Sequence, residues 1–293
     1  MRGQWRLCHA GGSSHRLLVM RRRHFLALPC AATALLAAPN PNLRLGVTDW
    51  NLGLAGKLEA LDLAAQIGFA GVEVSLGRKP IDGKLPFNNP AAHIERAKVL
   101  KLTLVSTCLD ILHVNGLKND KLGEKWLSDA IEINQALGVR NMLLPFFGAR
   151  ALETQQELDY VADLLRNIAP KAEKAQVTLG LENTNSAAEN LRILERAKSK
   201  AVRVFYDVGN SFSRGHDIYR EIPLLGRERI CQFHLKDNPG FLGQGGIHFP
   251  TVLSMIEQIG YRGFADLETS SPSRNIAADM ARNLGYLRSL MTA

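Results

Sequence analysis

Four segments in the second half of the chain share one pattern, an apolar, β-prone run that ends abruptly in a carboxylate or an imidazole. The four terminal residues are Glu182, Asp207, His234 and Glu268, and successive members lie 25, 27 and 34 residues apart. Each interval has room for one helix and two loops, which is the spacing of repeated strand–helix units. Because parallel strands in such units end on the same side, these side chains are expected to meet there.

Two glutamates, one aspartate and one neutral imidazole form a ligand set of mostly oxygen with one nitrogen. Such a set suits one divalent metal ion, and we expect Mn²⁺, with Mg²⁺, Co²⁺ and Zn²⁺ as alternatives. Taken singly, each residue is a weak indication, since a strand-end glutamate is more often a helix cap or an ion-pair partner. Asp207, which precedes Val-Gly-Asn, could equally belong to a turn. The recurrence at four consecutive strand ends is what predicts a metal site.

The elements that must position these residues begin at Leu43, where strand and helix patterns start to alternate. Eight such units in about 250 residues predict a single-domain (β/α)8 TIM barrel, an α/β fold whose active site lies at the carboxyl ends of its strands. The expected strands cover residues 43–48, 71–75, 102–108, 140–146, 177–182, 202–207, 230–235 and 263–268. The expected helices cover residues 56–67, 90–100, 121–137, 154–174, 187–198, 214–225, 249–259 and 275–290.

The net charge of +8 suggests a nucleic-acid partner until its position in the chain is considered. Residues 1–39 hold six arginines and no acidic residue, so the remainder has 30 basic and 28 acidic residues and is close to neutral. No large basic patch is therefore expected on the folded part, and we expect no nucleic-acid partner. Cys108 and Cys231 lie inside expected strands without CxxC spacing, and we expect both to be small buried residues.

Residues 1–39 form an N-terminal extension in which a signal peptide is expected, with Met20 as an alternative start of the chain. A basic cluster precedes an apolar stretch that is too short to span a membrane, and small residues follow before Pro39. Arg22-Arg23 resembles the twin-arginine (Tat) export signal, which predicts a periplasmic protein with no membrane span in its mature chain. The alternative is a basic tail on a cytoplasmic enzyme.

From about Leu43 to its end, the chain resembles the xylose isomerase-like superfamily of sugar isomerases and epimerases. The motifs that carry the resemblance are Leu181-Glu182-Asn183, Tyr206-Asp207-Val208-Gly209-Asn210, His234-Leu235-Lys236-Asp237-Asn238 and Leu267-Glu268-Thr269. The second and third motifs look like those of ketose 3-epimerases. The resemblance implies a xylose isomerase-like TIM barrel domain over residues 40–293, one divalent ion held by the four residues above, and a small carbohydrate substrate.

The resemblance also implies a metal-dependent isomerase, either a carbohydrate epimerase or an aldose–ketose isomerase. It would abstract a proton next to a carbonyl and pass through a metal-bound enediolate. Glu182 and Glu268 are the expected catalytic residues, because one can remove the proton and the other can return it. Return to the opposite face of the same carbon gives epimerisation, whereas return to the neighbouring carbon gives isomerisation.

Four further residues are expected to bind the substrate: Glu73, His113, Asn210 and Lys236. Glu73 ends the second strand and could instead orient a metal ligand or form a salt bridge. His113 follows the third strand, and Lys236 is expected near the ion, facing the substrate or pairing with Asp237. Asn210 stands where tagatose-type epimerases carry a substrate-binding histidine, so the sugar specificity of those enzymes does not carry over.

Three other features could contribute to the pocket. The glycine-rich segment 240–246 lacks the context of a dinucleotide fingerprint and is predicted to be a flexible loop over the pocket that contacts a sugar or phosphate group. Trp50 and Phe147, at the ends of the first and fourth strands, could stack on a sugar face or pack against neighbouring loops.

Three other functions remain open at this point. A lyase or dehydratase acting on a keto-sugar or keto-inositol would use the same metal site and the same first step. An apurinic-site endonuclease-like hydrolase would need more histidines at strand ends two, three and six, where the sequence offers Glu73, Cys108 and Asn210. A non-catalytic sugar-binding protein would tolerate the loss of Glu182 or Glu268. A homo-oligomer is also left open.

Overall fold

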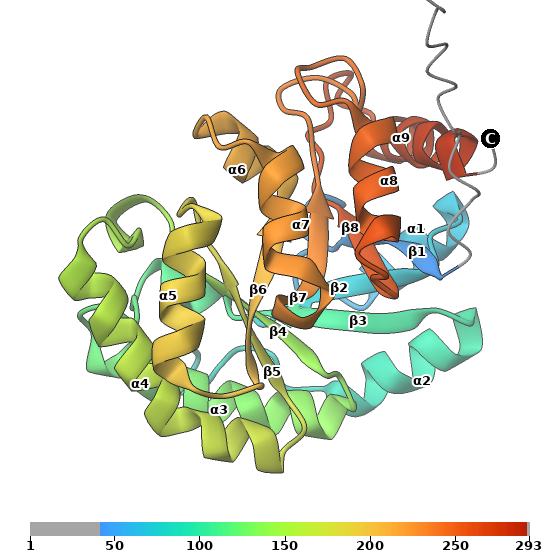
Figure 1. Ribbon diagram of the computed structural model, residues 1–293. Helices are drawn as coiled ribbons and strands as arrows, with labels where there is room; N and C mark the ends of the chain where they lie inside the picture. The colour runs from blue at the N-terminus through green and yellow to red at the C-terminus, as the bar shows by residue number, and fades with distance from the viewer. Residues whose placement is uncertain (1–41, 292–293) are drawn as a thin grey trace, which may run out of the picture. The chain divides into compact units, whose positions relative to one another are not determined.

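A computed structural model describes residues 42–291 as eight parallel strands that close into a barrel in sequence order (Figure 1). The predicted (β/α)8 fold is therefore confirmed. The expected twin-arginine signal in residues 1–39 lies outside the described residues. The strands are β1 (Leu43–Thr48), β2 (Gly71–Ser75), β3 (Thr103–Cys108), β4 (Asn141–Pro145), β5 (Thr178–Glu182), β6 (Val202–Asp207), β7 (Ile230–Leu235) and β8 (Gly263–Leu267).

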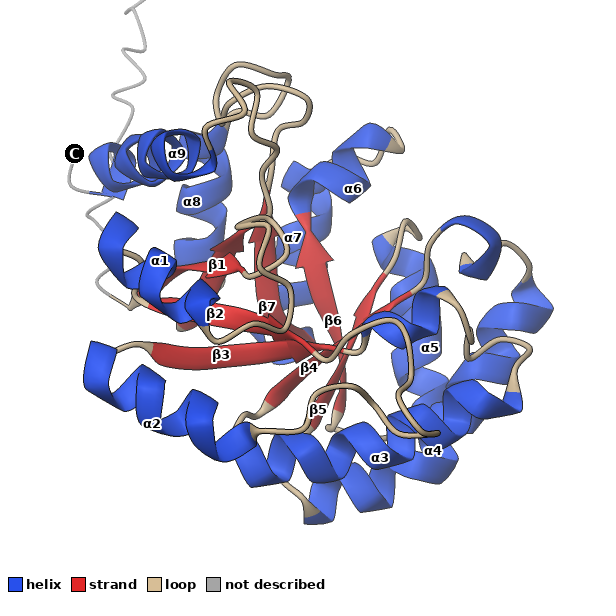
Figure 2. Cartoon of the chain, turned by 180° about the vertical axis from the view of Figure 1, so that it is seen from behind, coloured by secondary structure: helices blue, strands red, loops and turns tan. Residues whose placement is uncertain are grey.

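Helices lie outside the strands on all sides of the barrel (Figure 2). The α-helices are α1 (Glu59–Ile67), α2 (Pro90–Leu100), α3 (Lys121–Leu137), α4 (Gln155–Lys174), α5 (Ala187–Ala197), α6 (Val208–Ser213), α7 (Ile218–Arg229), α8 (Phe249–Gln258) and α9 (Ile276–Met291). Two short 3₁₀ turns, η1 (Asp110–His113) and η2 (Gly148–Arg150), follow β3 and β4. Among the described helices, none is long and apolar enough to cross a membrane.

The helix predicted over residues 214–225 corresponds to α7, which begins and ends four residues later, whereas α6, which precedes it, was not predicted. The Asp207 side chain accepts a hydrogen bond from the Asn210 amide and thereby starts α6 directly after β6. Gly215 has a left-handed backbone conformation, with a φ of 82°, and separates α6 from α7. Asp217 then accepts a hydrogen bond from the Tyr219 amide and caps the start of α7.

The buried side chains form one large cluster and a small one made of Cys108, Leu143, Phe205 and Cys231. Every residue of β2, β5 and β7 is buried. Left-handed glycines, Gly68 and Gly138, end α1 and α3 and return the chain to the next strand. Cys108 and Cys231 are buried free thiols, as predicted.

Candidate metal centre and active site

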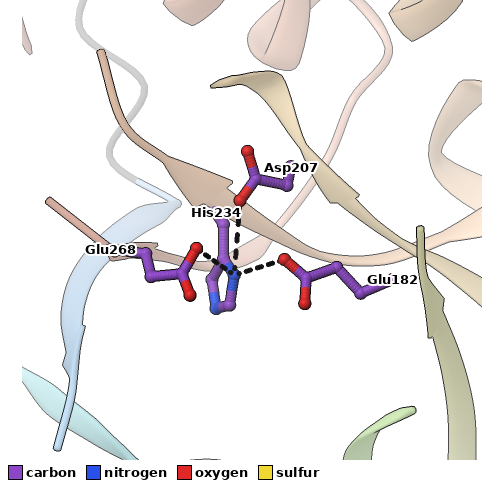
Figure 3. Close-up of side chains that lie close together, drawn as sticks. All are labelled: Glu182, Asp207, His234 and Glu268. Atoms are coloured by element: carbon purple, nitrogen blue, oxygen red, sulfur yellow. Dashed lines mark hydrogen bonds and ion pairs between the residues drawn. The ribbon is translucent and has the colours of Figure 1, made fainter. Parts of the chain in front are cut away.

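The four residues that ended the strand-like runs meet at the carboxyl end of the barrel (Figure 3). Glu182, Asp207 and His234 lie on β5, β6 and β7, and Glu268 directly follows β8. Each offers one ligand atom, and these atoms all lie within 4.8 Å of one another. The first three side chains are buried, whereas that of Glu268 is 18% exposed. Adjacent parallel strands thus bring together residues that are far apart in the sequence.

His234 directs one ring nitrogen at the three carboxylates. Its Nδ1 atom lies 3.2 Å from Glu182 Oε1, 3.5 Å from Glu268 Oε2 and 3.7 Å from Asp207 Oδ2. On the other side of the ring, Nε2 lies 2.8 Å from Oε2 of the fully buried Glu73. A carboxylate that accepts the Nε2 proton leaves Nδ1 free to bind a metal, which is the usual arrangement behind a histidine ligand.

Lys236 brings an ammonium group into the same cluster. Its Nζ atom lies 2.7 Å from Asp207 Oδ2 and 2.5 Å from Glu268 Oε2. The Lys236 stem passes over Gly209, where a Cβ atom would lie 2.4 Å from Lys236 Cγ, so the glycine of the Asp-Val-Gly-Asn motif provides the space. Three carboxylates against one ammonium leave two negative charges, which a divalent cation would balance. The donor set therefore fits one divalent metal ion.

The pKa values of the cluster also reflect its excess of carboxylates, because three of them are raised. Burial and the neighbouring glutamates raise the pKa of Asp207 to about 7, against the effect of Lys236. Burial opposes ionisation of Glu268 as well, but Lys236 and His234 outweigh it and lower that pKa to about 2. Burial disfavours the charged forms of His234 and Lys236, yet the surrounding carboxylates raise both pKa values.

A pocket of about 580 Å³ opens from the cluster. Asn210, Lys236 and His113, three of the residues expected to bind substrate, line this pocket. The side-chain amide of Asn210 donates a hydrogen bond of 3.2 Å from Nδ2 to Glu182 Oε1. Glu73 does not line the pocket, because it lies behind His234. Its expected role as a ligand-orienting group fits this position, whereas direct contact with substrate does not.

Both aromatic residues singled out in the sequence line the pocket. Trp50 Nε1 donates a hydrogen bond of 3.0 Å to Glu268 Oε1, so this indole fixes a member of the ligand set. Phe147 stacks with the His113 ring at a centroid distance of 6.1 Å and an interplanar angle of 22°. The pocket therefore has aromatic walls on the sides contributed by β1 and β4.

Sequence reasoning missed the wall formed by Ser75, Arg78 and Asp110. The Ser75 hydroxyl donates a hydrogen bond of 2.6 Å to Asp110 Oδ2, and the Arg78 Nε atom lies 3.9 Å from Asp110 Oδ1. Asp110 stands two residues beyond β3, at the start of η1, and only 6% of it is exposed. An acidic residue soon after a strand end was the available indication for Asp110.

The glycine-rich segment 240–246 is not the flexible pocket loop that was predicted. Oδ2 of the buried Asp237 accepts hydrogen bonds from the amides of Gly243 and Gly245, at 3.2 and 2.8 Å. The Leu242 amide donates to Asn283 Oδ1 on α9. Among the described residues, those that line the pocket do not include this segment. Internal hydrogen bonds therefore hold it to the body of the domain.

A second group of ligand-type residues, Glu73, His234 and Asp266, lies deeper in the barrel. It shares His234 with the first group, and all three side chains are fully buried. The structure places Glu73 in the middle of β2, which ends at Ser75, and Cys108 at the end of β3, so neither strand end carries the extra histidine that a nuclease-type metal cluster would need.

The fold and the site together define a (β/α)8 barrel with a metal-type ligand cluster at the carboxyl ends of its strands. The chain belongs to the xylose isomerase-like TIM barrel family, whose sequence profile matches residues 61–290. No curated protein sequence matched the chain.

Solved structures with the same fold include several sugar epimerases. D-allulose 3-epimerase from Methylomonas sp. superposes with a TM-score of 0.70 at 16% identity, covering 86% of this chain and 99% of that one. An L-ribulose 3-epimerase gives a TM-score of 0.70 at 19% identity, over 85% of this chain and 94% of that one. The 3-keto-D-glucoside 4-epimerase from E. coli gives 0.68 at 18% identity, over 84% and 99%. At these identities the likeness shows the fold.

Proposed function

We propose that the protein is a divalent-metal-dependent sugar isomerase or epimerase that moves a proton on a carbon next to a carbonyl. The observation that carries the proposal is the convergence of Glu182, Asp207, His234 and Glu268, with ligand atoms within 4.8 Å of one another beside a pocket of about 580 Å³. Solved structures with this fold include epimerases for D-allulose, L-ribulose and 3-keto-D-glucosides, which supports a carbohydrate substrate.

The four residues would hold the ion through one oxygen of each carboxylate and Nδ1 of His234. Mn²⁺ is the ion we propose first, with Mg²⁺, Co²⁺ and Zn²⁺ as alternatives. When bound, such an ion supplies Lewis-acid polarisation of a substrate carbonyl, which makes the neighbouring C–H group more acidic. Glu73 would keep the His234 ring in place through the Nε2 contact of 2.8 Å.

Glu182 and Glu268 would carry the proton transfers, because both carboxylates line the pocket and come from different strands. One glutamate takes the proton, and the electron pair of the broken C–H bond moves into the carbonyl to give an enediolate of the substrate. The other glutamate, protonated at the start, returns a proton to carbon. Return from the opposite face inverts the centre. Return to the neighbouring carbon, together with transfer of the hydroxyl proton on that side to the former carbonyl oxygen, exchanges aldose and ketose.

Two neutral donors on the pocket wall would keep the glutamates in position. Trp50 holds Oε1 of Glu268 at 3.0 Å, and Asn210 holds Oε1 of Glu182 at 3.2 Å. Each of these contacts is made to Oε1, and Oε2 of Glu268 is contacted by Lys236 instead. Lys236, which contacts Glu268 Oε2, would move with the glutamate or turn towards the substrate when an ion is bound.

Proton exchange with solvent is the direct test of this proposal. A panel of ketoses and 3-keto-sugars is incubated with the Mn²⁺-loaded protein in D₂O and followed by NMR. Deuterium gained at the carbon next to the carbonyl, with inversion or with conversion to an aldose, is the expected result. Deuterium gain followed by loss of water or an aglycone would favour the lyase alternative. A panel without any exchange would contradict the proposal.

The twin-arginine-type sequence in residues 1–39 supports a separate proposal, that the chain is exported to the periplasm. Replacing Arg22 and Arg23 by lysine keeps the charge and removes the arginine pair. The variant is then expected to stay in the cytoplasm, as measured by cell fractionation. Equal export of both forms would show that the pair has no such role and would favour the cytoplasmic alternative.

A further inference from the structure

The loops that follow β7 and β8 bear on the substrate of the proposed reaction. In (β/α)8 enzymes these two loops frequently hold a substrate phosphate with their backbone amides and a helix N-terminus. A phosphorylated sugar bound at the four-residue cluster would need such donors, or a group of cations, within reach of the pocket. The occupancy of these donors therefore distinguishes a sugar phosphate from a free sugar.

The loop after β7 already holds a carboxylate of the protein itself. Asp237 is 4% exposed, and its Oδ2 atom accepts the Gly243 and Gly245 amide hydrogens. A Cβ atom on Gly245 would lie 2.0 Å from Asp237 Oδ1, so the aspartate fills the concave side of this loop. The Asp237 carboxylate thus occupies the position that a bound anion would take, and these two amides are not available to a phosphate.

The loop after β8 repeats this arrangement with a second aspartate. Asp279, on α9 and 3% exposed, accepts hydrogen bonds from the Ser271 hydroxyl at 2.6 Å and the Ser273 amide at 2.9 Å through Oδ2. Its Oδ1 atom accepts the Ser273 hydroxyl at 2.6 Å. These five donors, from the loops after β7 and β8, are therefore bonded to carboxylates of the protein.

The charges that line the pocket also oppose a phosphate. Asp110, Glu182 and Glu268 present carboxylates to it, and the Lys236 ammonium is engaged by Asp207 and Glu268. Arg78 is the remaining arginine or lysine on the pocket wall described by the structure, and its side chain is 61% exposed. Because a bound divalent ion would balance Asp207, Glu182 and Glu268 together with Lys236, the pocket wall leaves Asp110 against Arg78 and offers a dianionic ester no net attraction.

Asp110 has the surroundings of an acceptor for hydroxyl groups. Ser75 holds Asp110 Oδ2 at 2.6 Å, while the 3.9 Å separation of Arg78 Nε from Oδ1 is longer than a hydrogen bond. The Cys108 thiol is a further hydrogen-bond partner of this carboxylate, and the remaining acceptor capacity of Oδ1 can take a hydroxyl from a bound ligand. Trp50 and Phe147 add aromatic surface to the same pocket, and a few fixed polar groups among apolar walls are typical of sites for uncharged ligands.

We propose that the pocket selects an uncharged, non-phosphorylated keto-sugar, and that Asp110, on the pocket wall, binds its hydroxyls. This inference rests on the proposed function, because it describes the substrate of the same site. It goes further in excluding sugar phosphates on account of the loops closed by Asp237 and Asp279.

Equilibrium binding separates this inference from the reaction itself. D-fructose and D-tagatose are each compared with their 6-phosphates by calorimetry on the full, Mn²⁺-loaded protein, and deuterium exchange is measured separately. At least one free sugar is expected to bind tenfold or more tightly than its ester, whether or not exchange occurs. Equal or tighter binding of the esters would overturn the inference, as would the absence of binding by both free sugars. A lack of exchange with selective binding would overturn only the proposed function.

Asp110→Asn sharpens the test, because it keeps the acceptor for Ser75 and removes the charge. The variant is expected to bind the free sugar about tenfold more weakly, and the ratio of its affinities for the free sugar and the ester is expected to fall. Asp129→Asn, the same change at an exposed aspartate of α3 that pairs with Lys125, is the matched control and should leave both affinities unchanged. An unchanged preference in a folded Asp110→Asn variant would contradict the role of Asp110. The comparison of sugar and ester uses the unaltered chain and does not depend on the variant folding.

Discussion

The two ends of the barrel carry hollows of nearly equal size and opposite character. The hollow at the carboxyl ends of the strands has a volume of about 580 Å³, and one at the amino ends has about 570 Å³. The first lies against buried charges, Glu182, Asp207 and His234, that converge on one point. The second is lined by cations, Arg140, Lys174, Lys200 and Arg203, together with the carboxylate of Glu173.

The difference shows that burial of charge, rather than size, distinguishes a functional pocket from a surface hollow. Exposed cations such as Lys174 and Lys200 remain hydrated, so they cost the fold little. The buried carboxylates and imidazole at the other end are costly unless a counter-charge joins them. A divalent ion is the counter-charge that the proposed function requires. The predictions below test this contrast, beginning with the largest expected effect.

Glu268→Gln is expected to reduce deuterium exchange by about 10² to 10⁴-fold, because the amide cannot take or return a proton. The exchange rate is measured by NMR with a substrate found in the ketose panel, and the melting temperature confirms that the variant is folded. Glu173→Gln, in the hollow at the amino ends, is the matched control and should leave the rate unchanged. A folded Glu268→Gln variant that keeps a tenth of the activity would contradict the assigned role.

Addition of Mn²⁺ at about 100 times its Kd is expected to raise the free energy of unfolding by about 2.7 kcal/mol, because the ion binds only the folded cluster. Asp207→Asn should abolish most of this gain, since it keeps a cap for α6 but removes one charged ligand. Thermal unfolding with and without Mn²⁺ measures the effect. Asp217→Asn, the same change at the cap of α7, serves as control; an equal loss of the gain there would refute a specific site.

Glu73→Gln is expected to weaken metal binding by about 10 to 100-fold, as is common when the partner of a histidine ligand is changed. The glutamine keeps the shape of the side chain but binds the His234 Nε2 proton without a charge. Titration with Mn²⁺ followed by electron paramagnetic resonance gives the affinity. Glu221→Gln is a second buried glutamate change, at a residue that binds the Tyr206 hydroxyl, and should leave the affinity unaltered. Equal affinities for both variants would remove Glu73 from the account.

The Glu157 carboxylate is a charge that side-chain and backbone donors stabilise without any metal, and it can be compared with the carboxylates of the four-residue cluster. Burial opposes its ionisation, but Lys118 at 2.7 Å and the amides of Glu153 and Thr154 lower its pKa to about 2. Because the folded pKa lies below the unfolded one, its stabilising effect is full above pH 4.5 and is lost as the pH falls towards 2. Glu157→Gln should cost about 1 kcal/mol at pH 7 and progressively less as the pH falls from 4.5 to 2, measured by urea unfolding. A cost independent of pH would contradict this.

The smallest effects are expected in the hollow at the amino ends of the strands. Replacing Lys174 and Lys200 by alanine should change the free energy of unfolding by no more than about 0.5 kcal/mol for each residue. The exchange rate should stay within twofold of that of the unaltered chain. A large loss of activity would contradict the claim that the hollow at the amino ends of the strands takes no part in the reaction.

Much of the barrel could be predicted from the sequence, because its strands are short β-prone runs bounded by glycines and polar residues. The expected ranges of β1, β2, β6 and β7 agree with the structure at both ends. The region after β6 could not be predicted in the same way. Val208–Ser213 is too short to show a helical period, and the Asp207 side chain that caps it was interpreted as a metal ligand or part of a turn, not as a helix cap.

The convergence of the four ligand-type residues could also be predicted, since strand ends in a parallel barrel share one rim. For Glu73 the sequence left a substrate contact and a ligand-orienting role open, and its position behind His234 could not be predicted. Beside Glu73 the pairing of β2 with β3 is irregular, because Val72 pairs with Leu104 and Glu73 with Ser106, which leaves Val105 of β3 as an extra residue that the sequence pattern does not reveal. Asp110 was missed because it lies in the η1 turn, outside any strand period, and approaches Ser75 only through the fold.

Anomalous X-ray diffraction from crystals grown with Mn²⁺ tests the central claim most directly. One manganese peak per chain is predicted, bounded by Nδ1 of His234 and by carboxylate oxygens of Glu182, Asp207 and Glu268. Lys236 should then have moved away from Asp207. The absence of manganese between these four residues in crystals that contain it elsewhere would contradict the account, whatever reaction the protein is found to catalyse.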